Sequence, residues 1–222
     1  MTAPSPRDAA ADLLVEIHAL PSGYTKYVRD LRRGRSRAWK SMSADFIHGV
    51  ALEARAWDRR RWLGYELIRF HKAAFAALDN ERVARLAEGL DSWDSVDGLG
   101  RILTGAAWAQ GLISDGLVEV WSRSPDRWMR RLALVTTIGL NMPADGGNID
   151  ARRTLAICAR LAADRDDMVE KALSWALRVL ATREPAAVVA FVADHEGVLA
   201  ARVKREVRNK LSSGLKNPRR RA

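Results

Sequence analysis

Residues 166–182 read DDMVEKALSWALRVLAT, and this stretch decides the fold class because its side chains repeat with the period of an α-helix. The apolar side chains fall on one side of that helix: Val169, Leu173, Ala176, Leu177 and Leu180. Lys171, Trp175 and Arg178 fall on the opposite side. Trp175 there either packs on a neighbouring pair of helices or forms, with the two cations, a platform for a phosphate and a sugar or base.

The same period runs through almost the whole chain, and strictly alternating β-branched runs are missing. Residues 32–37 read as a basic connector between helices. We expect helices near residues 7–19, 24–33, 43–55, 58–78, 80–91, 94–108, 113–122, 125–140, 149–163, 166–182, 184–194 and 197–212. Such lengths predict an all-α fold, an α-solenoid of about six HEAT-like helical hairpins with a concave basic face. A globular all-α bundle is the alternative.

The chain of 222 residues carries a formal net charge of +10 and has a pI of about 10.4. This balance fits phosphate backbones, and also acidic membrane surfaces or acidic proteins. The single cysteine, Cys158, lies in an apolar run and predicts a buried, reduced thiol, so we expect a cytoplasmic protein. The sequence contains no run of 18 apolar residues, so we expect no membrane-spanning helix. We expect a disordered leader over 1–6, one domain over 7–212 and a basic tail over 213–222.

The predicted helix over 94–108 carries an acid and an aromatic residue away from its apolar side. Trp93 and Asp97 are four residues apart, so they are neighbours if the first helical turn includes Trp93. In one interpretation Asp97 only caps the helix and Trp93 packs just before it. In the other, the pair belongs to a functional site. Gly98 and Gly100 favour the second interpretation slightly, because glycine permits close approach of another backbone.

The predicted helix over 125–140 places an arginine among apolar residues. Ser124 and Pro125 predict its start, and Trp128 and Arg131 fall in its apolar arc. An arginine in such a position needs an acidic partner or a bound phosphate, and the helix alone does not distinguish them.

Two basic segments flank this region, at residues 26–40 and 202–221. They fit a phosphate backbone but specify no base sequence. Pairs of cysteines at metal-binding spacing, HExxH and glycine-rich phosphate loops are missing, and the four histidines are scattered. We therefore expect no metal and no other cofactor, and chemistry that rests on carboxylates, arginines and aromatic rings.

Three short segments resemble, in order, motifs of the AlkD-type DNA alkylation repair family of HEAT-like-repeat DNA glycosylases. Residues 92–97 (SWDSVD) resemble its W-D-x-V-D segment, and residues 128–133 (WMRRLA) resemble its W-x-x-R-x-A segment. Residues 171–178 (KALSWALR) resemble its K-A-x-x-W-x-L-R segment. Lys204 and Arg205 are similar to a basic patch in the last repeat of the family.

The resemblance implies an enzyme that excises cationic N3- or N7-alkylated purines from duplex DNA without deep base flipping. It implies that Asp97 is the catalytic carboxylate and that Trp93 and Trp175 pack on the deoxyribose of the damaged nucleotide. The implied DNA-binding residues are Arg131, which holds the phosphate backbone, Arg178, Lys171, Lys204, Arg205 and Tyr27. Ser92 departs from the W-W-D that is frequent in the family, and the N-terminal third matches less well.

The residues leave two other functions open. The first is a non-catalytic HEAT-like module that binds nucleic acid, and the second is a solenoid scaffold for acidic proteins. Asp97 separates the enzyme from the binding module, because a module that only binds DNA needs no acid in a basic cleft. We expect a monomer that acts on double-stranded DNA and not on membranes.

Overall fold

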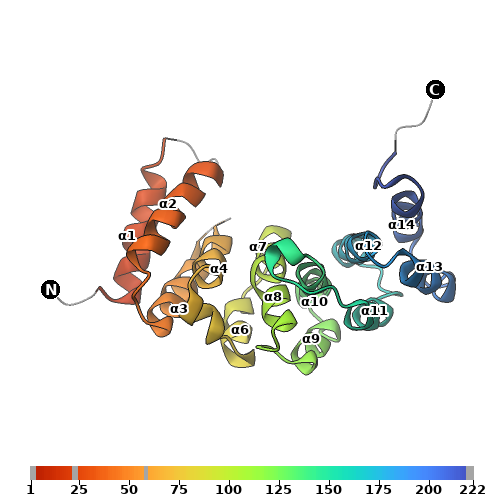
Figure 1. Cartoon of the computed structure of the whole chain (residues 1–222), viewed down its shortest axis with the longest axis horizontal. Helices are drawn as coiled ribbons and strands as arrows, with labels where there is room; N and C mark the ends of the chain where they lie inside the picture. Colours follow the sequence, from red (N-terminus) through yellow and green to blue (C-terminus); the bar gives the residue numbers. More distant parts are fainter. Residues whose placement is uncertain (1–3, 22–24, 58–59, 219–222) are drawn as a thin grey trace. The chain divides into compact units, whose positions relative to one another are not determined.

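The computed structural model describes residues 4–21, 25–57 and 60–218 of the chain (Figure 1). Every regular element in these ranges is helical, which confirms the all-α prediction. The α-helices are α1 (Pro6–His18), α2 (Thr25–Ala38), α3 (Ala44–Glu53), α4 (Arg61–Arg69), α5 (Lys72–Ala76), α6 (Asn80–Ala87), α7 (Trp93–Gly98), α8 (Gly105–Ala109), α9 (Asp115–Ser122), α10 (Arg127–Leu140), α11 (Ala151–Arg160), α12 (Asp167–Leu180), α13 (Pro185–Asp194) and α14 (Ala201–Ser213). The π-helix η2 (Leu99–Thr104) joins α7 to α8, and η1 (Ala54–Ala56) and η3 (Pro143–Asp145) are short 3-10 turns.

The chain divides into two compact units, Met1–Gly89 and Leu90–Ala222. In the first unit, α3 packs against α1, α4 and α5. Its core contains fully enclosed apolar side chains such as Leu13, Ile47 and Leu63. Burial of such side chains is the main term that holds a helical unit together, because each contributes about 1.5–3 kcal/mol relative to an exposed position.

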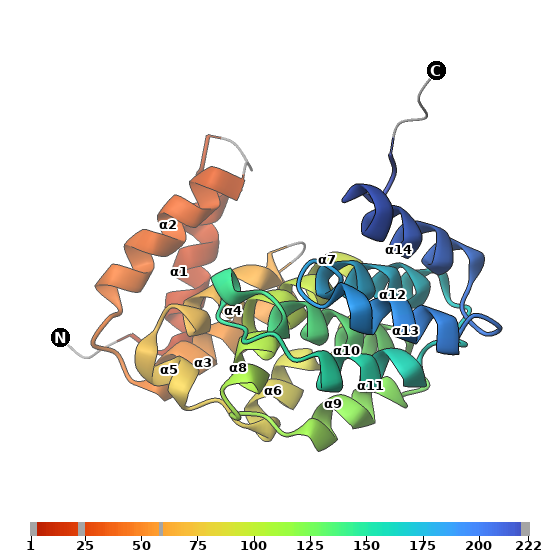
Figure 2. The same ribbon diagram turned by 45° about the vertical axis from the view of Figure 1, so that its right-hand side comes forward.

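In the second unit, alternate helices stack on one another. Helix α10 lies between the α7–η2–α8 segment and α12, and α12 packs in turn against α14 (Figures 1 and 2). Helices α9 and α11 contact each other and cover α10. Stacked helical hairpins are the packing of an α-solenoid, as the helix lengths predicted.

Three local predictions were wrong. The connector predicted at residues 32–37 is helical and belongs to α2, because arginine is a strong helix former. The helix predicted over 58–78 is divided into α4 and α5, since His71 Nδ1 accepts a hydrogen bond from the Ala74 amide at 3.1 Å and starts a new helix. Asp126, and not Ser124, caps α10 by accepting from the Trp128 amide at 2.8 Å.

The leader predicted over residues 1–6 overlaps the start of α1, because Ser5 caps this helix and Pro6 is its first residue. Residues 1–3 and 219–222, which belong to the predicted leader and basic tail, lie outside the described ranges. Cys158 is fully buried as expected, and this burial raises the pKa of its thiol. No helix in the described part of the chain has the length and apolarity to cross a membrane.

Candidate carboxylate site and nucleic-acid interface

Asp97 and Arg131 form a two-pronged ion pair in the second unit. The Nε atom of Arg131 donates to Asp97 Oδ1 at 2.9 Å, and its NH2 group donates to Oδ2 at 2.8 Å. The NH1 group of Arg131 donates to the backbone carbonyl of Met168 at 2.5 Å. One guanidinium thus joins α7, α10 and the first turn of α12, in the planar geometry that suits a carboxylate.

Close contact brings the η2–α8 segment, which follows Asp97 in the chain, against α10. A Cβ atom on Gly105 would lie 2.4 Å from the backbone of Gly139, and one on Gly100 would lie 2.7 Å from Val135 Cγ1. This confirms that Gly100 permits a close approach. The π-helix η2 begins two residues after Asp97, and such turns are frequent at functional sites.

Two opposing effects act on the pKa of Asp97. Burial raises it above the ordinary value of 3.8, because the charged form loses hydration. The guanidinium of Arg131 lowers it, since hydrogen bonding and opposite charge favour the carboxylate. Asp94 raises it further through like charge. The pKa of Asp97 is raised overall, because the loss of hydration on burial outweighs the effect of Arg131.

Trp93 is the first residue of α7, and its side chain is 58% exposed. The helix therefore includes Trp93, and the Trp93–Asp97 spacing places both on neighbouring turns. Ser92 occupies the N-cap position, and Asp97 pairs with Arg131 instead of capping the helix. An exposed indole beside a paired acid is unusual for a structural position, because a large aromatic ring is normally buried.

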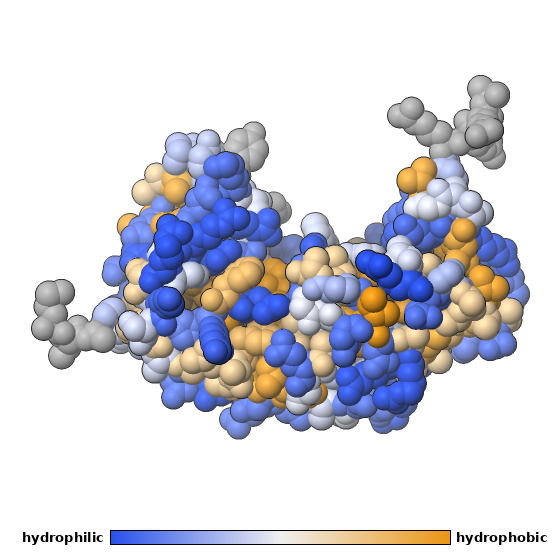
Figure 3. All heavy atoms as spheres, viewed as in Figure 1, coloured by the Kyte–Doolittle hydropathy of each residue, from blue (hydrophilic) through white to orange (hydrophobic). Residues whose placement is uncertain are grey.

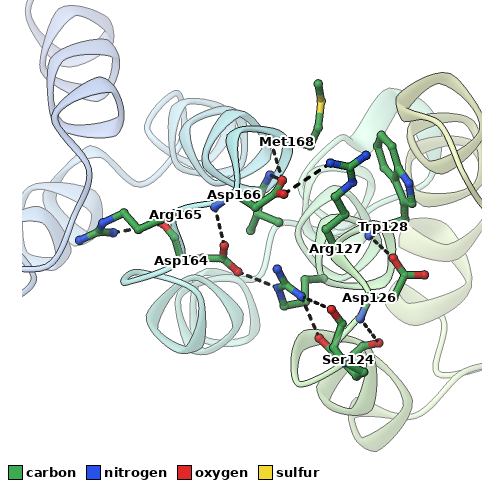
Figure 4. Close-up of polar contacts among 11 residues, drawn as sticks. Ser124, Asp126, Arg127, Trp128, Asp164, Arg165, Asp166 and Met168 are labelled. Atoms are coloured by element: carbon green, nitrogen blue, oxygen red, sulfur yellow. Dashed lines mark hydrogen bonds and ion pairs between the residues drawn. The ribbon is translucent and has the colours of Figure 1, made fainter.

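Trp128 is only half-buried and does not sit in the core as its place in the apolar arc suggested. Figure 4 shows the Arg127 guanidinium between the Trp128 ring, 4.8 Å away, and the Asp166 carboxylate, 3.8 Å away. Asp164 accepts from Arg130 Nε at 2.7 Å beside this group. These contacts fix the start of α12 against α10, and so they fix the Met168 carbonyl that receives Arg131.

The polar side of α12 is a row of cations around an aromatic ring, as predicted. Lys171 is exposed, and Trp175 and Arg178 are half-buried. Asp167 binds Lys171 at 2.6 Å and also pairs with Arg202 of α14. These two cations lower the pKa of Asp167 to about 2, so it stays ionised at neutral pH.

Glu206 of α14 is a buried acid on the same side of the unit, only 5% exposed. Its Oε2 atom accepts from Ser174 Oγ at 2.6 Å and lies 3.8 Å from Arg178 Nε. Burial lowers the pKa of the Arg178 guanidinium, and Glu206 opposes that shift. Lys216 Nζ lies 3.5 Å from Glu206 Oε1. A buried carboxylate of this kind organises the cations around it.

These side chains enclose a pocket of about 480 Å³ in the second unit. Its lining residues are Arg131, Lys171, Trp175, Arg178, Arg202, Glu206 and Lys216. Five of the seven are cationic and one is acidic, so the pocket fits an anion. Asp97 and Trp93 do not line it, but Arg131 does, and it connects the pocket to the Asp97 carboxylate.

A second pocket of about 470 Å³ adjoins the first and shares Trp175, Arg178 and Lys216 with it. Its other walls are more apolar and come from Met142, Pro143, Ala144, Val179 and Leu215, among others. Trp175 therefore has one cation-rich pocket and one largely apolar pocket beside it. Among the described residues, no cluster of three or more His, Cys, Asp or Glu side chains is arranged to hold a metal ion.

The remaining predicted residues lie elsewhere. Lys204 pairs with Glu196 at 3.2 Å, and Arg205 is exposed on α14. Tyr27 belongs to the first unit, where it is 41% exposed and Lys26 Nζ lies 5.5 Å from its ring. None of the three lines the pocket at Trp175.

Sequence reasoning missed several residues of the site. Asp167 lies four residues before Lys171, a spacing typical of a helical ion pair, so the pattern gave a usable signal. Glu206 gave none, because a single acid inside a basic run reads as part of an ordinary solvated face. Lys216 stood out only as one cation of the basic segment 202–221. The Met168 carbonyl has no sequence signal, since its role depends on how α10 and α12 meet.

Comparison with known proteins identifies the family of the chain. No curated protein and no solved structure gives a significant match. A family model, described as DNA alkylation repair enzyme, matches residues 29–211, which include Asp97, Arg131, Trp175 and Glu206 but not Tyr27. Because that match spans most of its length, the chain belongs to the DNA alkylation repair enzyme family.

Proposed function

We propose that this protein is a monofunctional DNA glycosylase that removes cationic N3- or N7-alkylated purines from duplex DNA, in base excision repair. The observation that carries the proposal is the Asp97–Arg131 pair next to a cationic pocket walled by Trp175. The family supports a role in repair of alkylated DNA, and the site supports this particular reaction.

The chemistry of the lesion explains why one carboxylate suffices. An alkylated purine already carries positive charge, so it departs as a neutral base and needs no strong general acid. The sugar left behind develops oxocarbenium character, which a nearby carboxylate stabilises while it positions a water. Asp97 takes this role in the proposal. Removing one such preorganised electrostatic contact typically costs about 3–4 kcal/mol of barrier.

Trp93 and Trp175 present aromatic faces to the deoxyribose in this mechanism. A π-face favours cationic character through its quadrupole, so both rings stabilise the same developing charge. The exposed Trp93 ring and the pocket position of Trp175 leave both accessible to a ligand. In this mechanism the damaged base does not enter a deep pocket, whereas most DNA glycosylases flip the target base out of the duplex into one.

Arg131 has a double role in the proposal. A guanidinium carries five N–H donors, and three of them make the bonds to Asp97 and Met168. Two N–H groups remain, and the side chain lines the pocket, so Arg131 orients Asp97 while it offers donors to a phosphate. Arg178, Lys171, Lys204, Arg205 and Tyr27 are the further DNA-binding residues that we propose.

One observation favours a second candidate, a DNA-binding module without catalysis. Both carboxylate oxygens of Asp97 already accept from Arg131, as they would in a purely structural ion pair. In that case the protein binds duplex DNA through the same cations and leaves the lesion intact.

Base release distinguishes the two candidates. The protein is incubated in excess with a duplex that contains one N7-methylguanine, and free base and abasic sites are measured. We expect release of the methylated base and none from the unmodified duplex. Binding without any release of base would contradict the glycosylase proposal and would support the binding module.

A further inference from the structure

The segment that follows α14 carries a lysine back to the Trp175 pocket. Helix α14 ends at Ser213, and Gly214 adopts a left-handed conformation with φ of 74°. A residue with a side chain is strained in that conformation, so glycine is what permits the chain to reverse here.

Hydrogen bonds hold the reversed segment against one face of α14. Asn209 Nδ2 donates to the Lys216 carbonyl at 2.9 Å, and Lys210 Nζ donates to the Gly214 carbonyl at 2.8 Å. Glu206 lies three and four residues before these two donors, on the same helical face. Lys216 Nζ lies 3.5 Å from Glu206 Oε1 as a result, at the rim of both pockets.

The ammonium of Lys216 remains available to a ligand. Its side chain is 45% exposed, whereas that of Glu206 is 7% exposed. The distance of 3.5 Å exceeds the 2.7–2.9 Å that is typical of a close charge-assisted bond. Glu206 therefore holds the Lys216 ammonium in place, and N–H groups of that ammonium remain free to bind a ligand.

We propose that Lys216 is a DNA-binding residue that contacts a backbone phosphate, and that the turn at Gly214 and the Glu206 carboxylate place it there. The inference rests on the proposed function only in taking duplex DNA as the ligand of this pocket. Arg178 and Arg131 line the same pocket, so one phosphate or two adjacent phosphates would meet several cations.

Duplex binding by three variants, over a salt range of about 50 to 200 mM, tests the inference. Lys216→Ala removes the ammonium, and Gly214→Ala keeps every charge but strains the turn. Arg123→Ala is the matched control, because Arg123 is exposed in the same unit and lines neither pocket.

We expect Lys216→Ala to weaken binding about fivefold at low salt and to reduce the slope of log affinity against log salt by about 0.9. Gly214→Ala should weaken binding in the same direction, whereas Arg123→Ala should stay within about twofold of the wild type. A Lys216→Ala protein that matches Arg123→Ala in affinity and slope would overturn the inference.

The wild-type protein separates this outcome from failure of the proposed function. If the wild type releases N7-methylguanine and binds duplex while Lys216→Ala behaves as the control, only the inference about Lys216 fails. If the wild type does not bind duplex DNA at all, both fail.

Discussion

Each of the two units contains a carboxylate that accepts arginine hydrogen bonds on both of its oxygens, but the two arrangements differ. Glu66 in the first unit is shared by Arg29 Nε and Arg32 Nε, each at 3.0 Å. Asp97 in the second unit is held by Arg131 alone. The side chain of Glu66 is 6% exposed and that of Asp97 is 17% exposed.

The surroundings of the two carboxylates also differ, and the difference supports the role that we propose for Asp97. Both arginines at Glu66 also lie over aromatic rings, Arg29 over Trp62 at 5.3 Å and Arg32 over Phe70 at 4.4 Å. Their guanidinium groups therefore connect α2 to α4. Figure 3 shows that hydrophilic residues gather on the surface over α2. Arg131 instead lines a pocket, so its carboxylate partner lies near a space that a ligand can enter.

Loss of the Glu66 carboxylate should give the largest change in stability. Glu66→Gln leaves the buried Arg32 guanidinium without its counter-charge, and breaking a buried ion pair costs about 3–5 kcal/mol. We expect a loss of that size in the free energy of unfolding, measured by urea denaturation. Base release per folded molecule should stay close to that of the wild type. A large loss of activity in well-folded Glu66→Gln protein would remove the distinction between the two carboxylates.

The next largest loss of stability is expected from the glycine contact between α8 and α10. Gly105→Ala places a methyl group 2.4 Å from the Gly139 backbone, so the helices must separate, at a cost of about 1–3 kcal/mol. Gly64→Ala in the first unit is the matched control, because its nearest contact is 3.0 Å. Thermal melting should show the greater loss for Gly105→Ala. Equal losses would mean that the approach of α8 to α10 is not especially tight.

The pH dependence of base release tests how burial and Arg131 set the pKa of Asp97. Asp97 must be ionised to act, and burial raises its pKa above 3.8, so release should fall as the pH drops through that raised pKa. Arg131→Met removes the cation that opposes the shift, so the pKa should rise further and the acid limb should move to higher pH. Arg131→Lys keeps the charge and should move the limb less. An acid limb that stays in place in Arg131→Met would contradict this account.

The smallest expected effect concerns Asp167, which pairs with two cations that line the pocket. With a pKa of about 2, this exposed carboxylate is ionised, and under the proposed function it would compete with DNA for Lys171 and Arg202. Asp167→Asn should therefore bind duplex DNA more tightly, by up to about fivefold, because exposed ion pairs contribute at most about 1 kcal/mol. Fluorescence anisotropy at low salt measures this gain. Weaker binding by Asp167→Asn would show that the carboxylate positions the two cations instead of competing for them.

Much of this organisation was predictable from the sequence. The helical period of residues 166–182 gave both the buried side of α12 and the row of Lys171, Trp175 and Arg178 opposite it. The helical period of residues 125–140 placed Arg131 among apolar residues, but it did not identify the partner, because Asp97 lies 34 positions earlier. Only tertiary packing brings two such residues together.

Other parts depend on packing that periodicity does not encode. Trp128 reads as a core residue by its place in the helical arc, yet its ring is only half-buried, with the Arg127 guanidinium 4.8 Å from it. Glu206 reads as one acid in a basic run, although the neighbouring α12 buries it against Ser174.

Single-turnover release of N7-methylguanine by Asp97→Asn decides whether Asp97 is the catalytic carboxylate. Asp91→Asn is the matched control, because Asp91 is an exposed carboxylate just before α7. Thermal melting and duplex binding of the same samples report whether each variant is folded and binds DNA. We expect Asp97→Asn to lose release by about 10²–10³-fold while it retains duplex binding, and Asp91→Asn to change little. An Asp97→Asn protein that releases the base at the wild-type rate would contradict this expectation.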